Sequence, residues 1–262
     1  MGKMLIDIHC HLDHYYFKDD LDKVIDNAKK AGLTVILTAG VNPETNRKAL
    51  EIAEKYDIVK PCLGIYPPIT LQKEINSGGY PLKENKFDID EEIEFIEKNK
   101  NKISAIGEVG LDYSRGEDSK RQKKIFEMMI SLAERINKLL VVHSRKAESD
   151  CVDILESSKL KKIIMHCFCG RKSLVKKIVD KGWFLTIPTS VVRSLQFQEN
   201  AKLSPITQLF CETDAPYLSP FKDRRNEPAF VIEAYKEVAE IKGMELKEVV
   251  NNIWMNWQKT FQ

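Results

Sequence analysis

Eight short apolar runs recur along the chain, and most are separated by stretches in which apolar residues return at helical spacing. Continuous apolar runs of this length are typical of strands in a parallel sheet that helices cover. Eight such runs within 262 residues predict an α/β fold, the (β/α)8 TIM barrel, with residues 1–262 forming a single domain. The runs read LIDIH, TVILTAG, IVKPCLGI, ISAIGEVGLD, LLVVHSR, KIIMHCF, WFLTIPTS and QLFCETDAP.

An open, doubly wound parallel sheet is the alternative fold for this alternation. The sequence contains neither G-x-G-x-x-G nor a P-loop, which a nucleotide-binding version of that fold would carry. We expect helices at about 20–31, 43–56, 89–99 and 120–137, one that ends at Gly182, and two more at 228–242 and 246–261. Residues 66–87 form the longest irregular stretch, expected to be either a lid or substrate loop or a solvated insertion.

The composition is that of a globular protein with a sizeable core, at 43% hydrophobic and 31% charged residues. A net charge of +2 argues against a strongly basic nucleic-acid-binding arm, although a local basic rim stays possible. No apolar run reaches 18 residues and no signal-peptide pattern follows Met1, so we expect a cytoplasmic protein without a membrane segment. Buried free thiols are expected rather than a disulfide framework at Cys10, Cys62, Cys151, Cys167, Cys169 and Cys211.

The first apolar run ends in two histidines, His9 and His11, with one residue between them. Side chains two apart in a strand point to the same side, so both imidazoles face one way at the strand end. Two neutral imidazoles on one side can share a metal ion. An isolated H-x-H is equally typical of two unrelated histidines, so the interpretation depends on what the other strands carry.

Four further runs carry a metal-competent side chain at or near their carboxyl ends: Glu108, His143, His166 and Asp214. The carboxyl ends of all eight strands of a barrel meet on one face, where active sites lie. Together with His9 and His11, six possible ligands would then share one pocket. His14, the fifth histidine, lies in the loop after the first run and is interpreted as structural or peripheral.

Imidazoles and carboxylates suit Zn²⁺, Mn²⁺ and similar divalent ions, whereas sites rich in oxygen suit Mg²⁺. Six ligands suffice for one or two ions, and two ions ~3.5–4 Å apart can activate a water for attack. Glu108 is the candidate for a bridge between them. Asp214 is the candidate to orient or deprotonate the water, because it arrives on a different strand from the histidines.

Six stretches in order resemble the TatD family of metal-dependent deoxyribonucleases, within the amidohydrolase-like superfamily: IDIHCHLD, IGEVGLDY, VVHSR, MHCF, ETDAPYL and RRNEPAFV. The resemblance implies a barrel that hydrolyses phosphodiester bonds in DNA, often as a 3′–5′ exonuclease on single strands. It also implies that one ion is held by His9, His11, Glu108 and Asp214. Glu108, His143 and His166 would hold the second.

One position departs from that family. Members usually read G-x-H-P after the third strand, where this chain reads GIYPP and places Tyr66 at the histidine position. Tyrosine can donate a hydrogen bond to a phosphate, but it cannot act as a cation near neutral pH. The departure therefore concerns substrate handling or rate, and it leaves the metal ligands intact.

A single-stranded DNA substrate, with RNA as a possibility, would need phosphate and base contacts around the pocket. Tyr66, Arg145, Arg171 and Arg225 are the candidate substrate-binding residues, since each follows a strand. Lys172, Arg193 and the KDRRN stretch at 222–226 could join the basic rim, and Tyr113, Phe168 and Tyr217 could stack on bases. Nothing in the sequence indicates a membrane or an obligate protein partner.

Two other functions stay open. The same ligands could serve hydrolysis of an amide, a lactone or the ester that joins an amino acid to tRNA, because activated water attacks carbonyl and phosphoryl centres alike. The chain could also be a metal-binding scaffold without activity, which only Tyr66 suggests. A serine hydrolase is disfavoured because no G-x-S-x-G motif is present. No cysteine has the setting of a nucleophile, although Cys167 beside His166 is the one to suspect.

Overall fold

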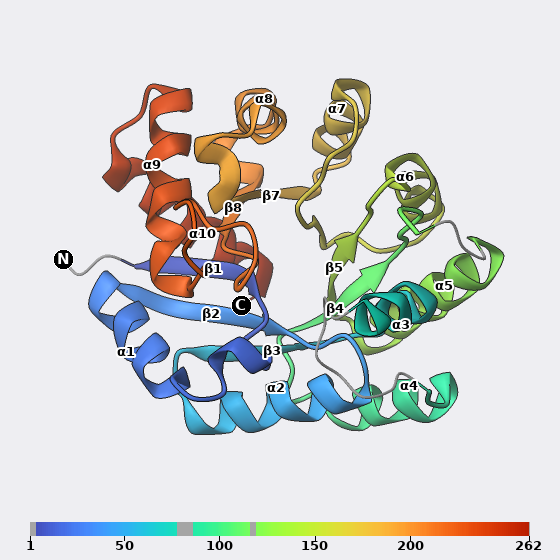
Figure 1. The fold of residues 1–262 in the computed structure, drawn as a ribbon. Helices are drawn as coiled ribbons and strands as arrows, with labels where there is room; N and C mark the ends of the chain where they lie inside the picture. Colours follow the sequence, from blue (N-terminus) through green and yellow to red (C-terminus); the bar gives the residue numbers. More distant parts are fainter. Residues whose placement is uncertain (1–3, 78–85, 116–118, 262) are drawn as a thin grey trace.

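The computed structural model describes residues 4–77, 86–115 and 119–261. Eight parallel strands form one sheet in sequence order, and helices surround them (Figure 1). The expected (β/α)8 barrel is confirmed, and the open sheet is not found. The strands are β1 (Leu5–Cys10), β2 (Leu33–Ala39), β3 (Val59–Leu63), β4 (Ala105–Gly110), β5 (Leu139–His143), β6 (Ile163–Met165), β7 (Phe184–Pro188) and β8 (Leu209–Glu212).

The sheet returns to β1 through the residues that follow β8. The amide of Asp214 donates to the carbonyl of His9 at 2.9 Å, and the amide of His11 donates to the carbonyl of Ala215 at 2.8 Å. Below them, the buried Asp7 carboxylate accepts a hydrogen bond from the amide of Thr213 at 2.9 Å. The edge at which the barrel closes is therefore also the edge that carries three of the predicted ligands.

The described residues contain three helices that the sequence does not predict. Helices α3, α6 and α8 were not expected, and α3 occupies the start of the stretch expected to be irregular. The reason is the Pro67–Pro68 pair, because proline suits the first turn of a helix. Residues 78–85 of that stretch lie outside the described residues. The α-helices are α1 (Leu21–Ala31), α2 (Pro43–Lys55), α3 (Pro68–Asn76), α4 (Ile89–Lys98), α5 (Ser119–Ile136), α6 (Glu148–Glu156), α7 (Lys172–Asp180), α8 (Leu195–Leu203), α9 (Val231–Lys242) and α10 (Leu246–Phe261).

Local signals explain where several helices begin and end. Asn42 caps α2 in a capping box with Thr45, in which each side chain accepts from the other's backbone amide. Gly32 ends α1 in the left-handed region, at φ 96°. Four short 3-10 helices complete the connections: η1 (Tyr15–Phe17), η2 (Thr189–Val192), η3 (Ile206–Gln208) and η4 (Pro228–Phe230).

The core lies between the strands and the inner faces of the helices. On α1, for example, Val24, Ile25 and Ala28 are buried at helical spacing, and each fully buried aliphatic side chain of valine size or larger contributes roughly 1.5–3 kcal/mol. All six cysteines are free, and four are buried, whereas Cys167 is half-buried and Cys169 is exposed. None of the helices in the described part of the chain has the length and apolar character that crossing a bilayer requires.

Candidate metal centre

Five of the six predicted ligands line a pocket of about 380 Å³ at the carboxyl ends of the strands, and the sixth, His9, is fully buried against them. They come from five strand ends that are far apart in sequence, and all six lie within two groups of converging atoms described below. His9, on β1, is fully buried, and His11 and Glu108 are each only 4% exposed. Side chains that are this polar and this buried require charged or hydrogen-bonding partners, and here they supply them to one another.

The first cluster consists of His9, His11, Glu108 and Asp214. The Oε2 atom of Glu108 lies 3.5 Å from the Nε2 atoms of both His9 and His11. Asp214 Oδ1 lies 3.7 Å from His9 Nε2 and 3.5 Å from His11 Nε2. Four ligand atoms therefore converge on one small volume.

The second cluster consists of Glu108, His143 and His166. Glu108 Oε1 lies 2.9 Å from His143 Nδ1 and 3.8 Å from His166 Nε2. One oxygen of Glu108 thus faces each cluster, which is the arrangement expected of a bridging carboxylate. His166 also stacks on His9, with ring centroids 3.8 Å apart, so the two clusters are contiguous.

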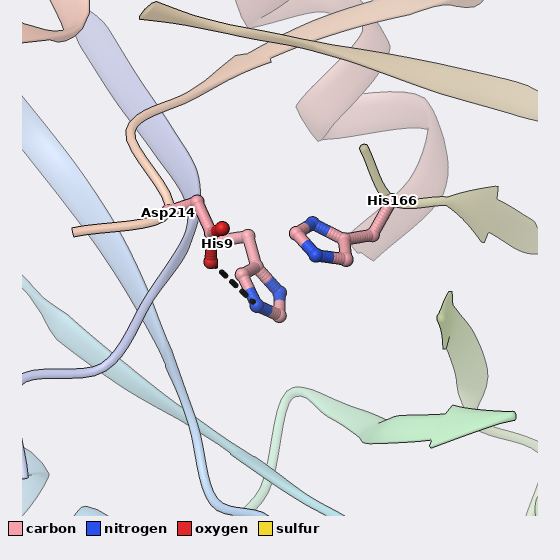
Figure 2. A group of neighbouring side chains, drawn as sticks. All are labelled: His9, His166 and Asp214. Atoms are coloured by element: carbon pink, nitrogen blue, oxygen red, sulfur yellow. Dashed lines mark ion pairs between the residues drawn. The ribbon is translucent and has the colours of Figure 1, made fainter. Parts of the chain in front are cut away.

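Backbone geometry at two positions brings the carboxylates inward. A Cβ atom at Gly64 would lie 2.5 Å from the backbone of Glu108, so only glycine lets the end of β3 approach β4 this closely. Asp214 has φ 55°, in the left-handed region that aspartate and asparagine tolerate best among larger residues. Figure 2 shows the result, with the Asp214 carboxylate facing His9 and His166 lying beside that ring.

The electrostatics of the two clusters are dominated by buried carboxylates. Burial opposes protonation of His11, but the hydrogen bond to Asp214 and the charge of Glu108 outweigh it and raise the pKa of His11 to about 10. Burial opposes protonation of His143 too, and hydrogen bonds to Asp112 and Glu108 raise its pKa to about 10. The pKa of Glu108 lies well below its usual value, since bonds from His143 and His9 overcome the burial. The clusters therefore attract positive charge.

Three of the imidazoles have one ring nitrogen engaged by an acceptor outside the clusters. His11 Nδ1 lies 3.0 Å from the carbonyl oxygen of Ala39, and His166 Nδ1 lies 2.9 Å from Glu212 Oε2. His143 Nε2 lies 3.0 Å from Asp112 Oδ2. When the imidazole is neutral, such an acceptor holds its proton on one nitrogen, so that the lone pair of the other nitrogen can face a cation in the cluster, as in many metal sites.

These observations fit a divalent cation. The possible ligand atoms lie within 4.8 Å of one another in each of three sets: His9, His11 and Glu108; Glu108, His143 and His166; and His9, His166 and Asp214. His9 Nδ1 is buried and has no hydrogen-bond partner among residues 4–77, 86–115 and 119–261. Imidazole with carboxylate is a donor set that borderline divalent ions prefer.

We expect Asp112→Asn to weaken metal binding about 10–100-fold, because a metal-bound histidine depends on its outer carboxylate for orientation and basicity. The affinity can be measured by competition with a chromogenic chelator. Asp150→Asn is the matched control. Asp112 accepts from the hydroxyl of Tyr66, and Asp150 likewise accepts from the hydroxyl of Tyr113, but Asp150 contacts neither cluster's histidines. Equal affinities for the Asp112 variant and the unmodified protein would contradict this role.

The remaining wall of the pocket is mixed in character. Tyr66 is buried, and its hydroxyl donates to Asp112 at 3.0 Å and lies 3.3 Å from His143 Nε2. Arg145 and Arg115 supply guanidinium groups, and Glu74, on α3, supplies a carboxylate. Burial raises the pKa of Glu74, and the charges of Asp112 and Glu108 add to that rise. A substrate in this pocket would therefore meet both positively and negatively charged side chains.

The structure brings Tyr66 and Arg145 to the pocket, but it does not bring Arg171 or Arg225 to its wall. Arg171 is exposed at the N-terminus of α7. Arg225 forms a two-pronged ion pair with Asp20, at 3.0 and 2.7 Å. The pocket wall therefore holds two of the four predicted substrate-binding side chains.

The aromatic side chains divide in the same way. Tyr217 lines the pocket. The prediction that Phe168 stacks on a base is wrong, because its ring is fully buried. Tyr113 donates its hydroxyl to Asp150 at 2.8 Å. His14 is buried and caps η1 by accepting from the amide of Tyr16, which agrees with a structural role.

Sequence reasoning missed four side chains at or around the pocket. Asp112 and Glu212 could have been found, since each stands at or just after a strand end within a stretch already recognised as informative. Glu74 and Arg115 carried no such signal, because Glu74 lies on the unexpected helix α3 and Arg115 in the loop after β4.

Comparison with known proteins places this arrangement in a family. The family model for TatD related DNase matches residues 6–262. The deoxyribonuclease TATDN3 of Homo sapiens is 36% identical, over 99% of this chain and 95% of its own. A metal-dependent hydrolase of Methanocaldococcus jannaschii is 35% identical, over 98% and 96%.

Solved structures agree. A hydrolase of the TatD family from Entamoeba histolytica superimposes with a TM-score of 0.83 at 26% identity, covering 100% of this chain and 99% of that one. The TatD homologue YJJV from Escherichia coli K12 has the same fold, with a TM-score of 0.87 at 23% identity and coverage of 100% and 99%. Because the family model spans nearly the whole chain, and relatives are more than 30% identical along almost their entire length, the chain belongs to the TatD related DNase family of metal-dependent hydrolases.

Proposed function

We propose that residues 1–262 act as one domain that hydrolyses phosphodiester bonds in single-stranded DNA. The observation that carries the proposal is Glu108, whose two oxygens face two clusters of imidazoles inside a pocket that also presents two arginines. The names of relatives support the substrate class, since the human relative is called a deoxyribonuclease. The six free cysteines support a reducing compartment, and we propose the cytoplasm.

The clusters define which residues would hold metal. His9, His11, Glu108 and Asp214 would hold one divalent ion, and Glu108, His143 and His166 would hold a second, with Mg²⁺, Mn²⁺ and Zn²⁺ as candidates. A divalent ion held there supplies a Lewis acid for the phosphoryl oxygens and lowers the pKa of a nearby water.

The protein's own groups supply the rest of the chemistry. The Asp214 side chain is 16% exposed, so it can reach both the ligands and a water in the pocket, and we assign it the positioning and deprotonation of that water. Arg145 and Arg115 would hold the phosphate and offset charge that develops on its oxygens. Tyr66 would donate to the same group or keep His143 in place.

The size of the pocket favours a strand end over a duplex. Its volume of about 380 Å³ lies in the range of small-molecule sites. The metal ligands lie buried in it, so a phosphodiester must enter a cavity that a flexible single strand can reach and a rigid double helix cannot. RNA would meet the same limits, and we propose DNA on the strength of the relatives alone.

The test is hydrolysis of a labelled single-stranded oligodeoxynucleotide by protein stripped with a chelator and resupplied with Mg²⁺, Mn²⁺ or Zn²⁺. Metal-dependent shortening is expected, with slower cleavage of duplex DNA. RNA of the same sequence, a lactone and an aminoacyl ester are run in parallel. Turnover of the lactone or the aminoacyl ester without cleavage of DNA would replace the nuclease with the alternative hydrolase.

We expect Tyr66→His to lower the KM for single-stranded DNA about fivefold, because an added positive charge at ~4 Å is worth about 1 kcal/mol in water. Burial and the charge of Glu74 raise the pKa of Tyr66 well above its usual value, so the native phenol stays neutral. A histidine among these carboxylates would be protonated. Steady-state kinetics decide, with Tyr66→Phe as the uncharged control, and an equal KM for both variants would refute the charge argument.

A further inference from the structure

Two tyrosines stand out in the loop that follows β1. Tyr15 and Tyr16 form η1 and are 45% and 50% exposed, although aromatic rings of this size gain from burial. Their centroids are 4.4 Å apart, so they present a joint apolar surface. The loop leaves β1 beside His9 and His11, on the face of the barrel that carries the pocket.

A continuous array of rings connects this pair with the pocket. The ring of His14 lies 4.7 Å from that of Tyr16 and 5.6 Å from that of Tyr217, centroid to centroid. Tyr217 lines the pocket, and its ring lies 6.4 Å from that of His11. The exposed pair is therefore linked to a side chain that lines the pocket through the ring of the buried His14.

The exposed pair is held in place rather than loose. His14 Nδ1 accepts from the amide of Tyr16 at 3.2 Å, and its Nε2 lies 3.2 Å from the hydroxyl of Tyr217. Arg225, fixed by Asp20, donates to the carbonyl of Tyr16. Burial, with the nearby charge of His11, lowers the pKa of His14 to about 4, so its ring is neutral at pH 7 and keeps Nδ1 as an acceptor.

We propose that Tyr15 and Tyr16 form a stacking platform for an unpaired nucleobase of the strand whose phosphodiester lies in the pocket. Exposed aromatic rings that are held in place are one way in which proteins bind single strands without reading their sequence. The proposal rests on the nuclease function above, and it adds a binding site outside the metal centre. It also explains the position of Arg225, which holds the backbone of Tyr16 in place instead of contacting phosphate.

The test compares Tyr15→Ala/Tyr16→Ala with the unmodified holoprotein on three substrates: a single-stranded 12-mer of thymidine, a 12-mer in which abasic spacers replace all but the terminal nucleotides, and bis(4-nitrophenyl) phosphate. We expect KM for the thymidine 12-mer to rise about tenfold, since each lost base–ring stack weakens binding by about that factor. We expect kcat to stay within about twofold. KM for the abasic 12-mer and for the small ester should not change.

Two further variants sharpen the result. Tyr15→Phe/Tyr16→Phe should retain the native KM, because stacking needs the rings and not the hydroxyls. Leu195→Ala, which removes another exposed apolar side chain, should also retain it. An equal KM for the alanine and native proteins on the thymidine 12-mer would overturn the platform. An equal loss on bis(4-nitrophenyl) phosphate would overturn it too, since the tyrosines would then only support the site.

Binding and oligomeric state separate this proposal from the function on which it rests. Fluorescence anisotropy with a labelled 12-mer, in chelator, should show about tenfold weaker binding by the alanine variant. If the native protein hydrolyses no phosphodiester, the proposed function fails, and the anisotropy comparison still decides the platform. If the variant instead changes only the sedimentation of the protein, the tyrosines contact a second copy and the platform is refuted.

Discussion

Glu108→Gln is expected to lose bound metal and to lower the hydrolysis rate by at least about 10³-fold, on the scale seen when a central electrostatic contact is removed from an active site. The variant keeps the shape of the side chain, but it removes the charge that both clusters share. Metal content by atomic emission and rates on single-stranded DNA should fall together. Glu108→Ala should behave in the same way.

A matched control separates charge at the site from the mere loss of a buried carboxylate. Glu92 is equally buried and accepts from Asn46 at 2.8 Å and from Arg47, and it belongs to neither cluster. Glu92→Gln should reduce the free energy of unfolding and leave the metal content intact. If Glu108→Gln kept both metal and rate, the bridging assignment would be wrong.

Asp214→Asn is expected to lower kcat by about 10²–10⁴-fold, the usual contribution of a general base, while KM changes little. Asparagine also tolerates the left-handed backbone. The hydrogen bond from the backbone amide of residue 214 to the carbonyl of His9, and with it the closure of the barrel, should therefore survive. The readouts are steady-state kinetics and metal content. Full kcat with metal bound would remove Asp214 from the chemistry.

Asp223 offers a control with the same backbone conformation. It too has φ 55°, but it is exposed in the loop after β8. Asp223→Asn makes the same chemical change in the same backbone region and should leave kcat unaltered. A comparable loss in both variants would point to the loop's conformation rather than to the Asp214 carboxylate.

The barrel could be predicted because its signal is repeated. Each of the eight strands is an apolar run, so a misplaced boundary in one of them leaves the number of strands unchanged. Helices α3, α6 and α8 were missed for a physical reason: each has only nine residues, and their apolar residues return less regularly at helical spacing than those of α7, which is equally short and was predicted.

The inner part of the site was predictable and its outer part was not. Ionisable residues at the ends of apolar strands are conspicuous, and topology alone brings His9 and Asp214 together. Arg171 and Arg225 were equally conspicuous, but the direction of a loop side chain depends on its neighbours, and Asp20 captures Arg225. Tyr15 and Tyr16 gave no signal, because exposure of an aromatic ring can be seen only in three dimensions.

The way in which the barrel closes links the stability of the fold to the metal that the site would hold. Glu108, His143 and His166 arise from three consecutive central strands, whereas the other ligand set unites the first strand with the residues after the last. An ion held by His9, His11 and Asp214 would therefore join β1 to the segment that follows β8. Because ligands that bind only the native state stabilise it by mass action, we expect removal of the metal to lower the free energy of unfolding as well as the hydrolysis rate.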